Sequence, residues 1–249
     1  MKAENKSTVD DEEIARFSRI ADEWWSETGK FAPLHRMNPL RIAYIRDKIL
    51  QNMHTQHSTL NTPLKGISIL DIGCGGGLIS EPMARLGASV TAIDAGEKNI
   101  AVAKLHAQKS GLDIDYRCTS VEELSEQNEE KFDAILALEI VEHVADLDLF
   151  IKSASKLLKP NGIIILSTLN RTAKSYALAI IGAEYILRWL PIGTHTWKKF
   201  LRPSELCRTL ENNGVEICEL TGMAMHPISQ KWRLDARDLS VNYLVVGKK

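Results

Sequence analysis

The sequence lacks the features that mark a membrane-spanning or nucleic-acid-binding protein. No run of eighteen or more apolar residues occurs among its 249 residues, so we expect no segment to span a bilayer. The formal net charge is only -1, which gives no bulk electrostatic attraction for a polyanion. We therefore expect no nucleic-acid partner, and a substrate that is small or lipidic.

Cysteines are few, and their spacing does not suit a zinc site. The four of them, Cys74, Cys118, Cys207 and Cys218, form no C-x-x-C pair and have no histidines at zinc-binding spacing. The N-terminal part carries four consecutive acids at positions 10–13 and no long apolar run, so we expect neither a secretory signal nor a transit peptide. Together these absences predict reduced thiols in a cytosol-like compartment.

The most informative stretch that is present covers residues 67–77. Its sequence Ile-Ser-Ile-Leu-Asp-Ile-Gly-Cys-Gly-Gly-Gly predicts a buried strand that leads into a glycine loop, and residues 78–85 have the composition of a helix. A ligand can lie against the backbone of such a loop because no Cβ intervenes. The dinucleotide fingerprint G-x-G-x-x-G does not fit, since the third small residue is replaced by Leu78 or, in the other register, by Ser80.

An acid precedes these glycines at the spacing Asp71-x-Gly73-x-Gly75-x-Gly77, which resembles motif I of the class I S-adenosylmethionine-dependent methyltransferases. That cofactor has no pyrophosphate, and its charged end is an amino acid. An acidic group near the turn and bare backbone suit such a ligand. We therefore predict cofactor contacts at Asp71, Gly73 and Gly75.

Two further acids lie where an adenosyl group would be bound. Asp94 ends the next predicted strand, twenty-one residues after Gly73, and is positioned to accept both ribose hydroxyls. Glu122 follows the third predicted strand, where an adenine ring would lie. Glu122 is equally well explained as a carboxylate in the first turn of a helix.

The order of strands and helices predicts an α/β fold with a doubly wound, mainly parallel, seven-stranded sheet, N-terminal helices and an inserted apolar helix. Residues 1–52 are expected to form a helical cap that contributes to the cofactor site, and residues 53–66 a polar linker. Residues 67–249 form the core, with the apolar insertion at about 172–200. Strands are predicted after the glycine corner at 88–93, 115–118, 132–138, 163–166, 215–220 and 241–246.

The N-terminal region carries one helix cap and one unusual arginine. Asp10, with Glu13 three positions later, predicts a helix start, and Trp24 lies on the apolar stripe that follows, either in a core or against an apolar substrate. Arg41 is expected near the start of the next helix, where the helix dipole disfavours a cation. Either a cofactor carboxylate or a surface salt bridge would hold it there.

Three polar side chains follow the fourth predicted strand, at the edge of the sheet where ligands bind in open α/β folds. If the turn there is helical, Glu139, Glu142 and His143 share one face. They would then hold a divalent cation, Mg or Zn, or prepare His143 as a general base. The alternative is a common strand-to-helix connection without a catalytic role.

Residues 175–191 are unusually apolar, and too few to cross a membrane. They suit a helix that lies at a membrane interface or covers a substrate, with Lys174, Arg188, Lys198 and Lys199 placed to meet anionic head groups. A helix packed on the sheet is the alternative.

Stretches spread along the chain resemble the ubiquinone-biosynthesis O-methyltransferase family. They are residues 33–41, 70–77, 103–107, 138–144, 167–172, 182–187 and 193–195. The resemblance implies methylation of 2-polyprenyl-6-hydroxyphenol and of 3-demethylubiquinol, with S-adenosylmethionine as methyl donor. It implies cofactor contacts at Arg41, Gly73, Asp94 and Leu138, and a divalent-metal triad at Glu139, Glu142 and His143.

For cellular placement, the resemblance implies a cytoplasmic protein peripheral to the inner membrane, in contact with it through residues 175–191, and a ubiquinone-biosynthesis complex as partner. Two other classes of function compete with this interpretation. A lipid-binding protein could use the same fold without catalysis, and a nicotinamide-dependent oxidoreductase could use a similar glycine corner. The replaced third glycine disfavours the oxidoreductase.

Overall fold

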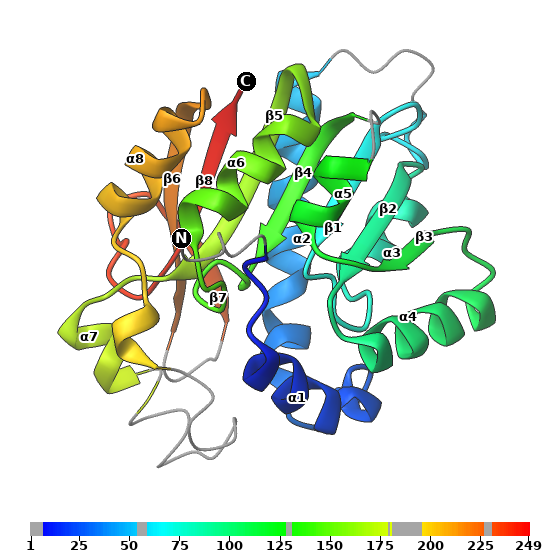
Figure 1. The fold of residues 1–249 in the computed structure, drawn as a ribbon, viewed down its shortest axis with the longest axis horizontal. Coiled ribbons are helices and arrows are strands. Elements are labelled where there is room, and N and C mark those ends of the chain that lie inside the picture. Colours follow the sequence, from blue (N-terminus) through cyan, green and yellow to red (C-terminus); the bar gives the residue numbers. More distant parts are fainter. Residues whose placement is uncertain (1–6, 54–58, 128–130, 179, 181–195, 227–230) are drawn as a thin grey trace, which may run out of the picture.

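The computed structural model describes residues 7–53, 59–127, 131–178, 180, 196–226 and 231–249 (Figure 1). In this part of the chain one eight-stranded sheet, in the order β3-β2-β1-β4-β5-β8-β6-β7, forms the centre of the molecule. The strands are β1 (Ser68–Ile72), β2 (Ser89–Asp94), β3 (Asp115–Cys118), β4 (Phe132–Leu138), β5 (Leu158–Leu169), β6 (Glu216–Met225), β7 (Trp232–Asp235) and β8 (Asn242–Lys248).

Strands β1 to β5 are parallel, whereas β8 is antiparallel to β5 and β6, and β7 is antiparallel to β6. The helices are α1 (Asp11–Arg19), α2 (Ala32–Asn52), α3 (Ser80–Arg85), α4 (Glu97–Lys109), α5 (Val121–Gln127), α6 (Leu147–Leu157), α7 (Ala173–Ser175) and α8 (Pro203–Asn212), with short 3-10 helices at Ala21–Glu23 and Trp197–Lys199.

Helices cover both faces of the sheet, which buries side chains of both orientations on the central strands. One core lies between the sheet and α2, α3 and α4, and includes Ile45, Met83 and Ala103. The other lies between the sheet and α5, α6 and α8, and includes Phe150 and Leu206. Adjacent β1 residues alternate between the two cores, as a parallel strand covered on both faces requires.

The predicted doubly wound α/β fold is confirmed. The described sheet has one strand more than the seven expected, because the short β7 pairs with the end of β6 through residues 222–225. Sequence patterns are weak for a strand of four residues whose side chains are only partly buried.

The prediction that Arg41 lies near the start of a helix is wrong. Helix α2 begins at Ala32, with Pro33 in its first turn, where the missing N–H costs nothing. The helix continues through Pro39, so Arg41 lies in its interior. Helix α2 packs into the same core as the central strands, through Met37, Ile45 and Ile49.

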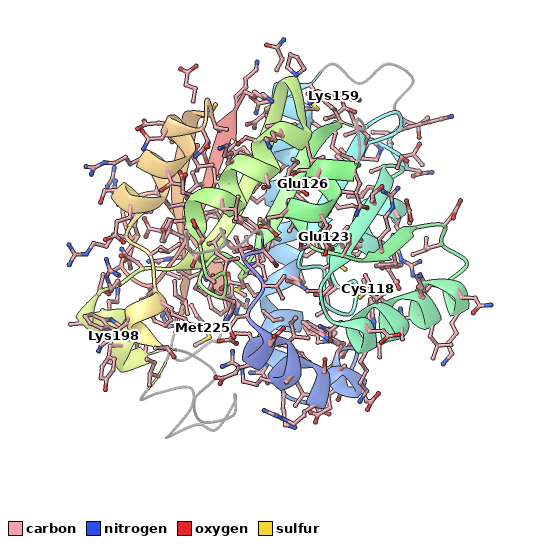
Figure 2. All side chains as sticks on the ribbon, viewed as in Figure 1. Cys118, Glu123, Glu126, Lys159, Lys198 and Met225 are labelled. Atoms are coloured by element: carbon pink, nitrogen blue, oxygen red, sulfur yellow. The ribbon has the colours of Figure 1, made fainter. Side chains whose placement is uncertain are left out.

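Asp10 caps α1 as predicted, accepting hydrogen bonds from the backbone N–H of Glu12 and Glu13. The four cysteines are all free thiols, and Figure 2 shows Cys118 at the end of β3. Within the described ranges, no helix is long and apolar enough to cross a membrane. Most of the predicted apolar helix at 175–191, with the motif stretches 182–187 and 193–195, lies outside the described residues.

Candidate functional site

A cavity of about 750 Å³ opens at the carboxyl ends of β1, β2 and β4. The glycine loop and the acids Asp94 and Glu122 line one part of it, and apolar residues of β6 and β7 line another. In Figure 1, α1 lies beyond the end of the sheet to which the β4 arrow points. A volume of this order accommodates a small-molecule ligand or two adjacent ones.

The glycine loop adopts a conformation that only glycine enters freely. Gly73, Gly75 and Gly77 have φ values of 71°, 54° and 86°. A Cβ at Gly73 would lie 2.8 Å from Ile140, and a Cβ at Gly75 would overlap the indole ring of Trp24. The loop therefore needs glycine both for its backbone angles and for close packing.

Asp71 is buried directly beneath this loop. Its Oδ2 accepts a 2.6 Å hydrogen bond from the hydroxyl of Ser80, the residue that replaces the third glycine in one register of the dinucleotide fingerprint. Burial raises the pKa of Asp71 to about 6, although the bond from Ser80 acts in the opposite direction. Ser80 thus has a structural role that explains its presence in the first turn of α3.

Asp94 is held in one orientation by three donors. Its Oδ1 accepts from the Gly96 N–H at 2.7 Å and from Nδ2 of Asn99 at 3.1 Å, and its Oδ2 accepts from the Gly75 N–H at 3.0 Å. Burial raises the pKa of Asp94, and these hydrogen bonds counteract that rise. The carboxylate joins the end of β2 to the glycine loop and lines the cavity.

Glu122 lies at the start of a helix, as one of its two alternatives predicts, and it also faces the cavity. It lies in the first turn of α5, and it also lines the cavity with a side chain that is 3% exposed. Its Oε1 accepts a 2.7 Å hydrogen bond from the hydroxyl of Thr8. Its Oε2 is buried and has no hydrogen-bond partner among the described residues, so it remains available to a ligand donor.

Arg41 forms a buried ion pair with Glu139, which replaces the surface salt bridge that was one alternative. Its guanidinium also donates to the hydroxyl of Ser167 at 3.3 Å. Burial lowers the pKa of Arg41, and the charge of Glu139 counteracts this. In the described part of the chain its Nε has no acceptor, and both Arg41 and Leu138 line the cavity.

The segment after β4 is a turn and not a helix. Glu139 has a φ of 53°, an angle uncommon for a residue with a side chain, so the helical face expected for Glu139, Glu142 and His143 does not form. Oε1 of Glu139 accepts from Ser167 at 2.8 Å and from Asn242 at 2.9 Å. Strand β8, distant in sequence, therefore helps to place this carboxylate.

Glu142 is buried, and its Oε2 accepts a 2.8 Å hydrogen bond from the hydroxyl of Thr168. Burial, together with the charge of Glu139, raises the pKa of Glu142 to about 8. Its Oε1 has no hydrogen-bond partner among the described residues.

His143 faces the N-terminal helix. Its Nδ1 lies 3.4 Å from Oε2 of Glu13, and its ring contacts Phe17 edge to face at 5.4 Å between centroids. Burial alone would raise the pKa of Glu13, but His143, Arg16 and Lys199 lower it below its ordinary value. Glu13 thus supplies a carboxylate beside the imidazole.

Sequence reasoning assigned Glu13 only to helix capping. An acid three residues after an N-cap residue indicates a helix start in any protein. No local sequence pattern connects position 13 with position 143. Only the packing of α1 over the turn after β4 brings the two side chains together.

The predicted cation site does not fit this arrangement. Among the residues that the structure describes, no group of three or more His, Cys, Asp or Glu side chains is placed to hold a metal ion. Glu139 is paired with Arg41, and Nδ1 of His143 faces Glu13.

The other part of the cavity is apolar and is built largely by the C-terminal strands. Met223 and Met225 of β6 and Trp232 of β7 line it, with Leu169 from the end of β5 and Leu178 after α7. Figure 2 shows Met225 on the same side of the molecule as Lys198. Unbranched methionine side chains adapt well to ligands of irregular shape.

Comparison with known sequences gives a consistent assignment. Residues 70–166 match the family model described as "Methyltransferase domain". Curated proteins named ubiquinone biosynthesis O-methyltransferase from Bradyrhizobium diazoefficiens and Bartonella quintana are each 53% identical to the chain. The first alignment covers 99% of this chain and 96% of the relative, and the second covers 100% of both.

Solved structures resemble the fold at much lower identity. A magnesium protoporphyrin IX methyltransferase from Synechocystis PCC 6803, solved with bound SAM, has a TM-score of 0.63 at 16% identity, with 97% of this chain and 98% of that chain covered. A methyltransferase from Clostridium acetobutylicum has a TM-score of 0.58 at 15% identity, covering 94% and 98%. From its similarity to the curated relatives over nearly its whole length, the chain belongs to the ubiquinone biosynthesis O-methyltransferase family.

Proposed function

We propose that the protein transfers a methyl group from S-adenosylmethionine to a phenolic oxygen of 2-polyprenyl-6-hydroxyphenol and of 3-demethylubiquinol. Membership in the family supports the reaction and the quinone-related substrate. One structural observation carries the proposal. A single cavity joins a polar part, lined by the glycine loop, Asp94 and Glu122, to an apolar part lined by Met223 and Trp232, so two dissimilar ligands can meet in it.

The polar part matches the functional groups of the methyl donor. Asp94 would accept from the ribose hydroxyls, and Oε2 of Glu122, which no other described residue contacts by a hydrogen bond, from the adenine amino group. Asp71 lies under the loop where an ammonium group would be stabilised, and the Nε of Arg41 would bind a carboxylate. Gly73 and Gly75 leave the backbone open to the ligand, and Leu138 adds an apolar contact.

When bound, S-adenosylmethionine supplies a methyl group already activated on a sulfonium. As the acceptor oxygen takes the methyl group it must lose its proton, so the protein has to provide a group that accepts this proton. Holding the two ligands in line supplies much of the rate. Removing the proton contributes roughly a further 10²- to 10⁴-fold.

His143 is our candidate for the proton acceptor. Oε2 of Glu13 lies 3.4 Å from Nδ1 of His143, so it would hold a proton on Nδ1 and leave Nε2 to accept the phenolic proton. Glu13 acts here as an orienting carboxylate, in the way that an acid fixes the tautomer of a catalytic histidine. Glu139 would act indirectly, by holding Arg41 in place through their ion pair. Glu142 lines the cavity together with His143.

The prenyl chain of such substrates is long and apolar, which supports two further parts of the proposal. Residues 175–191 would meet the surface of the inner membrane or cover the chain, and the protein would be cytoplasmic and peripheral to that membrane. A complex with other proteins of ubiquinone biosynthesis would shorten the path of an insoluble intermediate. These residues lie largely outside the described ranges, so the support comes from their composition.

The decisive experiment is transfer of a labelled methyl group from S-adenosylmethionine to a short-chain demethylubiquinol, with and without a chelator. We expect transfer in both, because the described residues do not form a cation site. Loss of transfer with chelator would mean that the reaction requires a divalent cation, as the triad of Glu139, Glu142 and His143 predicts. Absence of transfer under all conditions, with cofactor binding intact, would favour the non-catalytic lipid-binding alternative.

A calorimetric titration with S-adenosylhomocysteine and with NAD separates the methyltransferase from the oxidoreductase. We expect binding of the first alone, because the loop lacks the third small residue of the dinucleotide fingerprint. Binding of NAD instead would overturn the proposal.

A further inference from the structure

The N-terminal segment 7–31, which we call the cap, packs against the polar part of the cavity. It contains α1 and the 3-10 helix Ala21–Glu23. Ala21, Trp24 and Phe31 form a small apolar cluster with Leu78, the residue that follows the glycine loop. The cap also carries polar contacts to two of the acids expected to bind the cofactor.

The first contact runs from Trp24 to Asp94 through Asn99. Nε1 of Trp24 donates to Oδ1 of Asn99 at 3.0 Å, and Nδ2 of Asn99 donates to Oδ1 of Asp94 at 3.1 Å. An indole N–H can only donate and a carboxylate can only accept, so the amide between them has a single satisfactory orientation. Trp24 is 8% exposed and Asn99 3%, so water does not readily replace either partner.

The ring of Trp24 also lies directly on the glycine loop. A Cβ at Gly75 or at Gly76 would overlap it. Phe31 stacks on the indole with 3.8 Å between centroids and 9° between planes. The position of the N–H donor is therefore fixed by packing on both the loop and the cap.

The second contact joins Thr8 to Glu122. The threonine hydroxyl donates to Oε1 of Glu122 at 2.7 Å, and both side chains are buried. The carbonyl of Thr8 in turn accepts from the N–H of Ala145 at 2.9 Å, which anchors the segment beside the turn after β4. With Oε1 occupied, the buried Oε2 of Glu122, which has no partner in the part of the chain that the structure describes, is the oxygen left for a ligand.

We propose that Trp24 and Thr8 are positioning residues that orient Asp94 and Glu122 for the cofactor, so that docking of the cap and cofactor binding are coupled. The inference rests on the proposed function, since it takes the polar part of the cavity as the methyl-donor site. Trp24 and Thr8 also line the cavity, and the inference assigns their effect on donor affinity to the orientation of Asp94 and Glu122. By linkage, the donor stabilises the docked cap to the same extent.

The test uses the full chain and S-adenosylhomocysteine as probe, titrated by calorimetry into wild type and three variants. Trp24→Phe keeps the stacked ring and removes the N–H, and Thr8→Val keeps the shape and removes the hydroxyl. Each should weaken binding about tenfold, since a buried acceptor loses its donor. The KM for S-adenosylmethionine should rise by a similar factor, while the KM for the acceptor stays unchanged.

Asp22→Asn is the matched control. Asp22 also joins the cap to α4, through Lys98 at 2.6 Å, but this pair is exposed and contacts neither acid. The dissociation constant of Asp22→Asn for S-adenosylhomocysteine should stay within about twofold of wild type, because an exposed ion pair contributes little to the stability of the docked cap. Equal weakening in all three variants would mean general loosening of the cap, and would overturn the inference.

Hydrogen exchange of the wild-type protein provides a readout that does not depend on the variants folding. In wild type, S-adenosylhomocysteine should slow exchange of the cap amides as well as those of the glycine loop. Slower exchange only in the glycine loop would overturn this inference and leave the proposed function intact. Wild-type affinity in both Trp24→Phe and Thr8→Val would do the same. Absence of binding to wild type overturns the proposed function itself.

Discussion

Arg41 and Glu139 form an ion pair across 98 residues of sequence, between the interior of α2 and the end of β4. The arginine side chain is only 3% exposed and that of the glutamate 21%. A buried guanidinium without a counter-charge is strongly unfavourable, so each residue fixes the place of the other. The pair lies where the polar part of the cavity meets the turn after β4.

Glu139→Gln should lower the free energy of unfolding by about 3 kcal/mol, because it leaves the Arg41 charge buried without its partner. Replacing both residues, with Arg41→Met and Glu139→Gln, should restore part of that loss. Chemical denaturation of the two variants measures the difference. Equal stability of Glu139→Gln and wild type would show that solvent already screens the pair.

His143→Ala should reduce kcat at least tenfold and leave the affinity for S-adenosylmethionine nearly unchanged, as expected for a contact made in the transition state. Glu13→Gln should have a smaller effect of the same kind, because the imidazole remains but loses its orienting carboxylate. Steady-state kinetics with calorimetry separate the two parameters. Unchanged turnover in His143→Ala would remove this residue from the mechanism.

Asp94→Ala should weaken cofactor binding by more than tenfold, because it removes the proposed ribose acceptor and leaves the N–H groups of Gly75 and Gly96 without their partner. Calorimetry with S-adenosylhomocysteine measures this change. Normal affinity would refute the assignment of Asp94 to the ribose.

Asp71 should give the stability a recognisable pH dependence. Burial raises its pKa from 3.8 to about 6, so the folded state holds a proton that the unfolded state releases between these values. Its contribution to stability is therefore largest below pH 4 and is lost as the pH rises through 6. Relative to Asp71→Asn, wild type should lose about 1.4 kcal/mol between pH 5 and 7.5.

Denaturant titrations of wild type and Asp71→Asn at the two pH values test this, since carboxyl groups that do not interact with Asp71 cancel in the difference. A stability difference in the opposite direction, or one that does not change with pH, would show that Asp71 is ionised in the folded protein throughout this range.

Gly75→Ala should abolish cofactor binding and lower stability by more than Gly111→Ala does. Both glycines have positive φ, 54° and 66°, so alanine is strained at either by about 1–2 kcal/mol. Only at Gly75 would the new Cβ also meet Trp24, whereas at Gly111 no atom lies within 4 Å. Thermal unfolding and calorimetry compare the two variants, and equal effects would show that the ring of Trp24 moves aside without cost.

The fold class and the polar half of the site could be predicted from the amino-acid sequence alone. Parallel strands covered on both faces are continuous apolar runs, and alternating glycines directly after such a run indicate a turn with positive φ angles. For that reason the strand ends at Asp94 and Leu138 and the loop at Gly73 and Gly75 could be located without a structure. Local pattern and local geometry coincide at these positions.

The way in which distant parts complete the site depends on tertiary packing. The contacts of Glu13 with His143, Thr8 with Glu122 and Arg41 with Glu139 each join segments about a hundred residues apart or more. No periodicity encodes such pairs, because they depend on how α1 and α2 pack against the sheet. The turn at Glu139 was missed for a related reason: its side chain is held by Arg41, Ser167 and Asn242, which come from three other elements.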